Sequence, residues 1–257
     1  MEAGSQNRSI PRALEVRQLV KFYRGATQPA LDGLDVTIEP GQVFGLLGPN
    51  GAGKTTAISI LCTLLKPTSG SLSIFGIDVL RQPAQVRRLI GLVPQEIALY
   101  PALSVRENLT YFGRLHGLRG GDLRQRIDHC LEMVALRDQA DRPLAGFSGG
   151  MKRRANLAAG VLHQPRLLFL DEPTVGIDAQ SRHMILENLG RLREAGMTMV
   201  YTTHYMEEAQ QLCDRIAIVD AGRVIAEGRP SDLIAGVAGC GTLEALFLHL
   251  TGRQLRD

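Results

Sequence analysis

The chain has 257 residues, 44% of them hydrophobic, and a formal net charge of +3 at pH 7. This size and hydrophobic content suffice for one large α/β domain with subdomains. So small a charge argues neither for nucleic-acid binding, which prefers clustered basic surface, nor for a membrane-embedded chain. No apolar run approaches the roughly 18 residues that a spanning helix needs, and the polar N-terminus is unlike a signal peptide, so we expect a soluble intracellular chain.

The N-terminal part of the sequence predicts a flexible tail followed by a small antiparallel sheet. Residues 1–13 are assigned to the tail. Residues 14–39 hold two strand-like runs separated by a polar turn at Gly25, which predicts two antiparallel strands. Tyr23 is expected on this sheet, where a tyrosine with a purely structural role would also fit.

A glycine-rich loop follows the apolar run 43–47 and matches the phosphate-binding pattern G-x-x-x-x-G-K-[ST]. Its residues are Gly48, Pro49, Asn50, Gly51, Ala52, Gly53, Lys54, Thr55 and Thr56. The glycines let backbone N–H groups point at a phosphate, and a helix predicted over 55–65 directs its positive end to the same place. We expect Lys54 to contact the β- and γ-phosphates, Thr55 to bind Mg²⁺ and Thr56 to lie near the α-phosphate. An accidental glycine-rich turn is the weaker alternative in this context of strand and helix.

Gln95 ends the next apolar strand, predicted over residues 90–94. A polar side chain at the carboxyl end of such a strand faces the ligand crevice, where it would reach Mg²⁺ and the attacking water. A glutamine after a proline is also an ordinary turn residue. Its predicted role therefore depends on the motifs around it.

Residues 100–160 change to a helical pattern. Ser104 and Glu107 form the S-x-x-E capping box of a helix, and residues 122–136 carry apolar side chains at helical spacing. We therefore expect a helical subdomain over about 100–160. It ends in the helix that follows the Ser148-Gly149-Gly150 turn.

Acidic and imidazole side chains end two further predicted strands. Asp171 and Glu172 follow the apolar run 167–170, which is typical of a buried parallel strand. We expect Asp171 to hold Mg²⁺ through water and Glu172 to polarise the water that attacks the γ-phosphate. The alternative is a helix N-terminus with favourable negative charge. His204 follows the β-branched run 198–203 and is placed to hydrogen-bond the γ-phosphate, although a lone histidine is more often structural.

These motifs occur in one order along the chain. They are Tyr23, the phosphate loop, Gln95, Ser148-Gly149-Gly150, Asp171-Glu172, Asp178 and His204. The order resembles that of the nucleotide-binding subunit of an ATP-binding cassette (ABC) transporter over nearly the whole chain. The resemblance implies a P-loop NTPase (RecA-like) α/β core with a small antiparallel β subdomain and an inserted α-helical signature subdomain. This nucleotide-binding domain would span residues 14–235, and a C-terminal helical tail would span residues 236–257.

The resemblance also implies how ATP is bound and used. Adenine would stack on Tyr23, and two copies would form a homodimer with two ATP molecules trapped between them. Ser148, Gly149 and Gly150 of one copy would bind the γ-phosphate held by Lys54 of the other. Asp178 would lie in the loop that crosses the dimer axis, although by itself it is also a good N-cap for the following helix.

The signature motif begins with Phe147 and carries Met151 where glutamine is usual, as in a branch of prokaryotic-type exporters. The basic residues after it, 152–154, are interpreted as a solvated helix face. Residues 241–253 resemble the tail of drug, sodium, and lipid or polysaccharide exporters. These features imply export through a separate ABC-2-type permease, with this chain bound at the cytoplasmic face of the membrane. The permease would dock near Leu99, Tyr100 and Leu103, which ordinary packing of the helical subdomain would explain equally well.

Two other functions remain open at this point. One is a non-transport cassette ATPase acting on ribosomes or DNA, for which tandem cassettes, coiled-coil inserts or basic arms are expected and none is visible. The other is a regulatory cassette that binds ATP without turnover. The intact Lys54, Glu172 and His204 count against the second alternative, and we expect no nucleic-acid partner.

Overall fold

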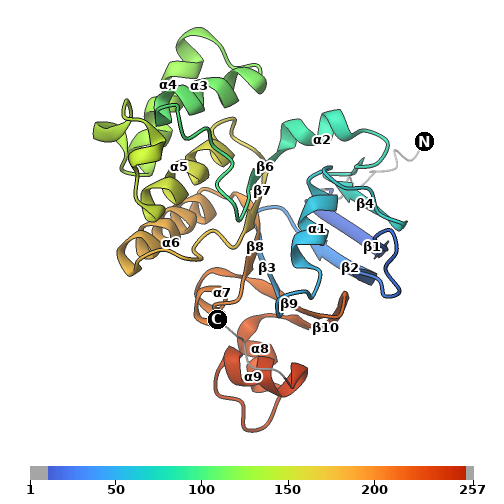
Figure 1. The fold of residues 1–257 in the computed structure, drawn as a ribbon. Helices are drawn as coiled ribbons and strands as arrows, with labels where there is room; N and C mark the ends of the chain where they lie inside the picture. The colour runs from blue at the N-terminus through green and yellow to red at the C-terminus, as the bar shows by residue number, and fades with distance from the viewer. Residues whose placement is uncertain (1–10, 253–257) are drawn as a thin grey trace, which may run out of the picture.

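The computed structural model describes residues 11–252. The predicted tail over 1–13 therefore lies mostly outside the described residues, as does the end of the predicted tail over 236–257. Within the described range, the strands form two sheets, one of four strands and one of six. Figure 1 shows the six-stranded sheet at the centre of the molecule, with other elements against both of its faces.

The smaller sheet is antiparallel, with strand order β2-β1-β4-β5. Its strands are β1 (Leu14–Lys21), β2 (Leu31–Ile38), β4 (Ser69–Ile74) and β5 (Ile77–Asp78). The predicted antiparallel pair is confirmed as β1 and β2, in which Leu14 pairs with Ile38 and Lys21 with Leu31. Tyr23 lies in the loop after β1 rather than within a strand, because the chain leaves the sheet at Lys21.

The larger sheet has the strand order β10-β9-β3-β8-β7-β6. These strands are β3 (Val43–Leu47), β6 (Ile90–Val93), β7 (Leu167–Asp171), β8 (Thr198–Thr203), β9 (Arg215–Asp220) and β10 (Arg223–Gly228). All neighbouring pairs are parallel except β9 with β10. Because parallel strands end at the same edge, the segments after β3, β6, β7 and β8 meet there.

The central sheet is covered on both faces, and every residue of β3, β7 and β8 is buried. Side chains alternate between two cores: Phe44 and Leu46 pack on one side, Val43 and Leu47 on the other. Figure 1 shows α1 (Lys54–Leu61) and the smaller sheet on one face. The same view shows α6 (Ala179–Glu194) and α7 (Met206–Leu212) on the opposite face. Burial on both faces explains the continuous apolar runs seen in these strands.

The helix after the phosphate loop is shorter than predicted, ending at Leu61 rather than Leu65. Cys62 caps it through a backbone N–H bond to Ile58. Thr63 then adopts a left-handed backbone with φ of 63°, which ends the helix. Such a reversal in a β-branched residue is costly and is not encoded in the apolar spacing, which continues past it. A further helix, α2 (Pro83–Leu89), leads into β6.

The predicted helical subdomain contains α3 (Val105–Leu115), α4 (Gly120–Met133) and α5 (Gly149–Val161). Short 3-10 turns at Arg137–Gln139 and Leu144–Gly146 connect α4 to α5. The capping box of α3 is confirmed, since Ser104 Oγ accepts from Glu107 N at 3.2 Å and Glu107 Oε2 accepts from Ser104 N at 2.8 Å. These helices stand together to one side of the central sheet (Figure 1).

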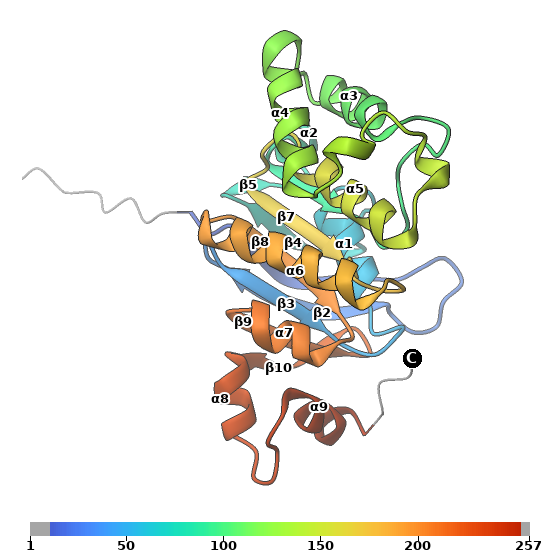
Figure 2. The ribbon, with the colours of Figure 1, turned by 90° about the vertical axis from the view of Figure 1, so that its left-hand side faces the viewer.

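The C-terminal part forms α8 (Pro230–Ala235) and α9 (Leu243–Thr251). Helix α9 buries Leu243, Leu246 and Phe247 and packs against α7 and α8. Figure 2 shows both helices below α7 and β10, at the end of the molecule away from the helical subdomain. Among residues 11–252, no helix is both long enough and apolar enough to span a bilayer.

Candidate functional site

The phosphate loop runs between β3 and α1 and is held close to neighbouring backbone. A Cβ on Gly53, whose φ is 104°, would lie 2.4 Å from the carbonyl oxygen of Ala30. A Cβ on Gly48 would lie 2.3 Å from the carbonyl oxygen of Val219. Only glycine fits at these two positions. Asn50, Gly51 and Thr55 are exposed along the loop and the start of the helix, as a phosphate-binding surface requires.

The Lys54 side chain is buried inside the loop, with 6% of its surface exposed. Its Nζ donates to the carbonyl oxygens of Gly48 at 2.7 Å and Pro49 at 3.2 Å. The same atom lies 3.8 Å from Glu172 Oε1. Burial lowers the pKa of Lys54, while the charges of Glu172 and Asp171 oppose that shift. The loop therefore holds an ammonium group beside the N-terminus of α1, where anions are favoured.

The three predicted catalytic residues follow different strands, and two of them, Gln95 and His204, approach the carboxylate of the third, Glu172. Gln95 Nε2 donates to Glu172 Oε2 at 3.3 Å, and His204 Nδ1 lies 3.4 Å from the same oxygen. The Glu172 backbone has a φ of 47°, and its N–H donates to Thr202 Oγ1 at 3.0 Å. A left-handed glutamate is rare, and such backbone strain concentrates at functional sites. This conformation turns the chain sharply as β7 ends.

The groups predicted to hold Mg²⁺ all offer oxygen, the ligand atom that this hard cation prefers. Asp171 is 4% exposed, and its Oδ1 accepts from Thr202 Oγ1 at 2.7 Å. Thr55 is exposed in the first turn of α1 and carries a hydroxyl oxygen. Gln95 donates to Glu172 with its amide nitrogen, which leaves its amide oxygen available. This chemistry fits a magnesium ion that is also bound by nucleotide and water.

Tyr23 borders the phosphate loop although residues 22–30 form a connection outside the sheet. Its hydroxyl lies 3.2 Å from Thr56 Oγ1, and Lys21 Nζ lies 5.5 Å from its ring centroid. The side chain remains 47% exposed. An exposed ring at this place is available to stack on a flat heterocycle.

The signature turn has a different environment. Ser148 caps α5, and its Oγ accepts from Met151 N at 3.2 Å. A Cβ on Gly150 would meet Ser181, and one on Gly149 would approach the carbonyl oxygen of Gly176. The neighbours of the signature turn are thus its own helix and residues 176–181. Among residues 11–252 of one copy, no hydrogen bond joins Ser148, Gly149 or Gly150 to the phosphate loop.

Asp178 lies in the segment 174–178, here called the cassette loop. Its Oδ1 accepts from Ser181 N at 2.8 Å, which confirms the expectation that it can cap the following helix. The hydrogen bond from the Ser181 backbone lowers the pKa of Asp178. Its predicted position across a dimer axis stays a prediction.

The interpretation of 152–154 as a solvated helix face is wrong for Arg153 and Arg154. Arg153 donates to the carbonyl oxygen of Gln95 and, at 3.2 Å, to that of Val175. Arg154 donates to the carbonyl oxygen of Val134 at 2.7 Å. Burial lowers the pKa of both arginines. Arg153 thus links the Gln95 turn to the cassette loop. In the sequence, the only local indication of this role is that Arg153 lies one helical turn after Gly150, on the same side of the helix.

A family model described as "ABC transporter" matches residues 31–175, which span the phosphate loop, the signature turn and the acidic motif. The chain belongs to the ABC transporter family. The linearmycin resistance ATP-binding protein LnrL of Bacillus subtilis is 46% identical over 88% of this chain and 72% of its own length. The Nod factor export ATP-binding protein I of Cupriavidus metallidurans is 45% identical over 95% of this chain and 79% of its own.

Solved structures agree with this ABC assignment. An ATP-binding subunit of an ABC transporter superposes with a TM-score of 0.84 at 30% identity, covering 93% of this chain and 99% of that one. A dimeric cassette in a post-hydrolysis state with ADP and Pi gives a TM-score of 0.77 at 28% identity, over 84% and 98%. The P-loop NTPase fold and the ATPase assignment are thereby confirmed. The chain is an ATP-hydrolysing subunit of an ABC transporter, rather than a cassette of either alternative class.

The ABC cassette has an apolar pocket of about 400 Å³ between β6, α3 and α5. Of the three residues predicted to meet a permease, Leu99 lines this pocket, whereas Tyr100 and Leu103 do not. Leu99 is almost fully buried, and Tyr100 is 48% exposed beside it in the chain. Stacked rings of His116 and His163, 3.7 Å apart, form another part of the lining.

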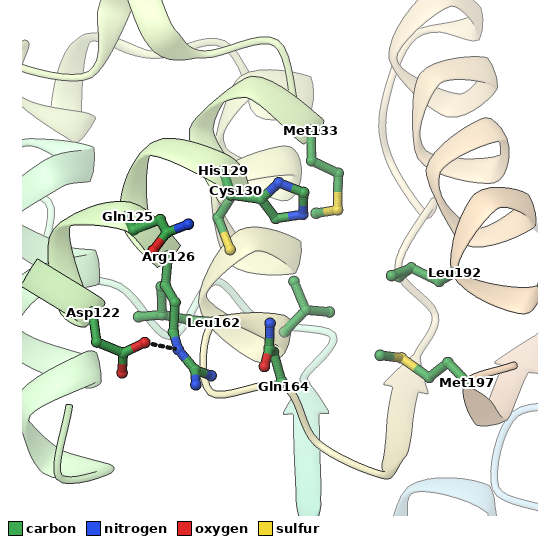
Figure 3. Close-up of a pocket in the computed structure, with 11 residues that line it drawn as sticks. Asp122, Gln125, Arg126, His129, Cys130, Met133, Leu162, Gln164, Leu192 and Met197 are labelled. Carbon is green, nitrogen blue, oxygen red and sulfur yellow. Dashed lines mark hydrogen bonds and ion pairs between the residues drawn. The ribbon is translucent and has the colours of Figure 1, made fainter. Parts of the chain in front are cut away.

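A second pocket, of about 540 Å³, lies between α4, the end of α5 and the segment that follows α6 (Figure 3). Asp122 and Arg126 form an ion pair at 3.0 Å along one side of it. Met133 and Met197 approach it from opposite sides. None of the predicted nucleotide-site residues lines this pocket.

Proposed function

We propose that this cassette hydrolyses ATP at two sites shared between two copies and thereby drives export through a separate membrane permease. The observation that carries the proposal is the convergence of Lys54, Gln95 and His204 on the Glu172 carboxylate, within 3.8 Å in every case. A general base, a cation that binds phosphate, and two groups that orient water or phosphate thus lie together at one edge of the central sheet. These are the parts that phosphoryl transfer to water requires.

In this proposal, the phosphate loop and Lys54 bind the β- and γ-phosphates, and the Tyr23 ring stacks on adenine. The oxygen of the attacking water forms a bond to the γ-phosphorus, and Glu172 accepts a proton from that water. The bond between the γ-phosphorus and the bridging oxygen breaks, and ADP leaves with that oxygen. His204 donates to the γ-phosphate, and Gln95 orients the water. Thr55, Asp171 and Gln95 hold Mg²⁺, which supplies electrostatic stabilisation of the phosphate oxygens.

The second half of each site comes from the other copy. Ser148, Gly149 and Gly150 lie at the N-terminus of the 13-residue helix α5. Their backbone N–H groups would bind the γ-phosphate, because a helix N-terminus favours anions. The dimeric neighbour with ADP and Pi supports this arrangement. ATP favours closure because it is bound by both copies only in the closed dimer, and hydrolysis removes that bridge.

Export is supported by the names of the relatives, which describe linearmycin resistance, daunorubicin/doxorubicin resistance and Nod factor export. We infer a permease of the ABC-2 type that docks at the apolar pocket beside Leu99 and keeps this chain at the cytoplasmic face of the membrane. The half-buried Arg153 then joins the docking side to the cassette loop, since it bonds both Gln95 and Val175 backbones. The cargo would be determined by the permease.

Dilution tests the shared-site proposal directly. At saturating ATP, turnover per chain is expected to rise with protein concentration. It should approach background when the chain is diluted far below the dissociation constant of the dimer. Phosphate release would measure turnover, and light scattering on the same samples would measure the fraction of dimer. Concentration-independent turnover from chains shown to be monomeric would contradict the proposal.

Metal removal provides a second test. Excess EDTA is expected to reduce phosphate release to background, because the charge on the phosphate oxygens would no longer be neutralised. Added Mg²⁺ should restore the full rate, and Thr55→Val should require a higher Mg²⁺ concentration for half of its maximal rate. Ser59→Ala is a matched control, because it removes a hydroxyl that bonds the Thr55 carbonyl oxygen one turn along the same helix. A rate unaffected by EDTA would contradict the assignment of the metal.

A further inference from the structure

A buried carboxylate, that of Glu208 in α7, is the centre of a hydrogen-bonded cluster beside the catalytic groups. The residue is 4% exposed. Its Oε2 accepts from the hydroxyls of Tyr201 at 2.6 Å, Thr174 at 2.9 Å and Thr203 at 3.0 Å. Burial, followed by the charge of Glu208, raises the pKa of Tyr201 well above its ordinary value, so this hydroxyl keeps its proton and donates it. Three donors on one oxygen offset much of the cost of burying the charge.

The donors belong to the segments that carry the catalytic groups. Thr203 immediately precedes His204, and its Oγ1 also accepts from Tyr205 N at 2.9 Å. The backbone is therefore fixed on both sides of His204. Thr174 starts the cassette loop, two residues after Glu172. Glu208 thus ties the end of β8 to the beginning of the cassette loop through one carboxylate.

The other carboxylate oxygen faces α6. Arg182 Nε lies 3.7 Å from Glu208 Oε1, and its guanidinium lies 4.3 Å from the ring centroid of Tyr205. In the described part of the chain, both of these atoms are buried and neither has a hydrogen-bond partner. The separation is slightly too long for a hydrogen bond, so a small shift between α6 and α7 would complete it. Arg182 N also bonds the carbonyl oxygen of Asp178 at 3.0 Å, which connects this pair to the far end of the cassette loop.

We propose that Glu208 is a positioning residue that couples His204 to the cassette loop, an inference that rests on the proposed shared site. It touches neither nucleotide nor attacking water in that proposal. It acts by holding the backbone on the N-terminal side of His204 through Thr203. Thr174 and Arg182 connect the same carboxylate to the two ends of the cassette loop, which faces the other copy in the proposed dimer. Contact between the copies at the cassette loop is thereby transmitted to the imidazole that binds the γ-phosphate.

The first test compares Glu208→Gln with Glu207→Gln, a neighbouring exposed acid on the same helix. Glutamine keeps the shape of the side chain but removes the charge and half of its acceptor capacity. For Glu208→Gln, we expect kcat for ATP hydrolysis to fall about tenfold, as displacement of a catalytic group does, with KM for ATP within about twofold of wild type. Glu207→Gln should retain the wild-type kcat. A kcat for Glu208→Gln equal to that of Glu207→Gln would overturn the proposal.

A double-mutant cycle separates positioning of His204 from a general structural role. If Glu208 acts through His204, Glu208→Gln should change the residual rate of His204→Ala by less than about twofold, because the group it positions is gone. A reduction of the same size in both backgrounds would overturn the proposal. If Glu208→Gln fails to fold by circular dichroism, Thr174→Val enters the same cycle, since it removes one donor and leaves the carboxylate. The same two outcomes then apply to it.

Failure of this inference is distinguishable from failure of the proposed function. Loss of turnover in Glu172→Gln, with ATP-dependent dimerisation retained, supports the shared ATPase site whatever Glu208 does. A normal Glu208→Gln rate in that situation overturns only the positioning role. Turnover in Glu172→Gln at the wild-type rate would overturn both.

Discussion

Replacing Glu172 with glutamine is expected to lower ATP turnover by about 10²- to 10⁴-fold, the usual contribution of a general base. The amide cannot accept the proton of the attacking water. It has nearly the shape of the carboxylate, so the contacts of Lys54, Gln95 and His204 around it change little. ATP binding should persist, and the closed dimer should accumulate because the step that removes the γ-phosphate bridge is blocked.

Size-exclusion chromatography with light scattering, with and without ATP, would detect this dimer, and phosphate release would measure turnover. Glu194→Gln is a matched control, because Glu194 is an exposed acid at the end of α6. It should hydrolyse ATP normally and form no long-lived dimer. A Glu172→Gln protein that remained monomeric with ATP and still hydrolysed it would show that the base assignment and the shared site are both wrong.

The sequence placed the proposed catalytic residues at the edge of the sheet, as the structure has them, because each one follows the end of a strand. Runs such as 43–47 and 167–170 are apolar throughout, since the sheet is buried on both faces, and a polar residue after such a run marks the sheet edge. The close approach of Gln95 and His204 to Glu172 follows from the strand order, in which β6, β7 and β8 are neighbours. That order is seen in the structure, and no local pattern in the sequence encodes it.

Other features depend on contacts that local sequence does not encode. Arg153 bonds the carbonyl oxygen of Gln95, a residue 58 positions away, and a helical wheel of α5 alone shows only a basic side chain. The left-handed backbone of Glu172 likewise depends on Thr202, which bonds its N–H from the neighbouring strand. Thr63 ends α1 by a backbone reversal while the apolar spacing continues. In each case, tertiary contact decides the outcome over local preference.

Changing either glycine of the signature turn to alanine is expected to impair the protein, but for different physical reasons. A Cβ on Gly150 would lie 1.9 Å from Ser181 Oγ and 2.4 Å from Ser181 Cβ, so α5 must move away from α6. Such overpacking typically costs about 1–3 kcal/mol of the free energy of unfolding. A Cβ on Gly149 would meet only the carbonyl oxygen of Gly176, at 3.9 Å, which is ordinary contact. Gly149→Ala should therefore retain the wild-type thermal stability.

If the proposed shared site is right, Gly149→Ala should nevertheless lower turnover by about 10²-fold, the cost of losing one preorganised donor to a developing charge. The new methyl group would meet the γ-phosphate bound by the other copy and keep it away from the backbone N–H groups of the signature turn. Thermal denaturation and phosphate release on both variants would separate the two effects. Equal loss of stability in the two variants would contradict the packing argument. Normal turnover in Gly149→Ala would contradict the proposed role of the signature turn.

Mixing two inactive variants decides whether the signature turn acts on the other copy. In a mixed dimer of Gly149→Ala with Lys54→Ala, one site carries both defects and the other carries neither. With random pairing, about half of the dimers are mixed and each has one intact site, so an equimolar mixture should regain about one quarter of the wild-type rate. Lys54→Ala mixed with Glu172→Gln is the control, because both of its sites remain defective and no activity should return. Absence of recovery in the first mixture, with mixed dimers verified by affinity tags, would show that the signature turn does not complete the site of its partner.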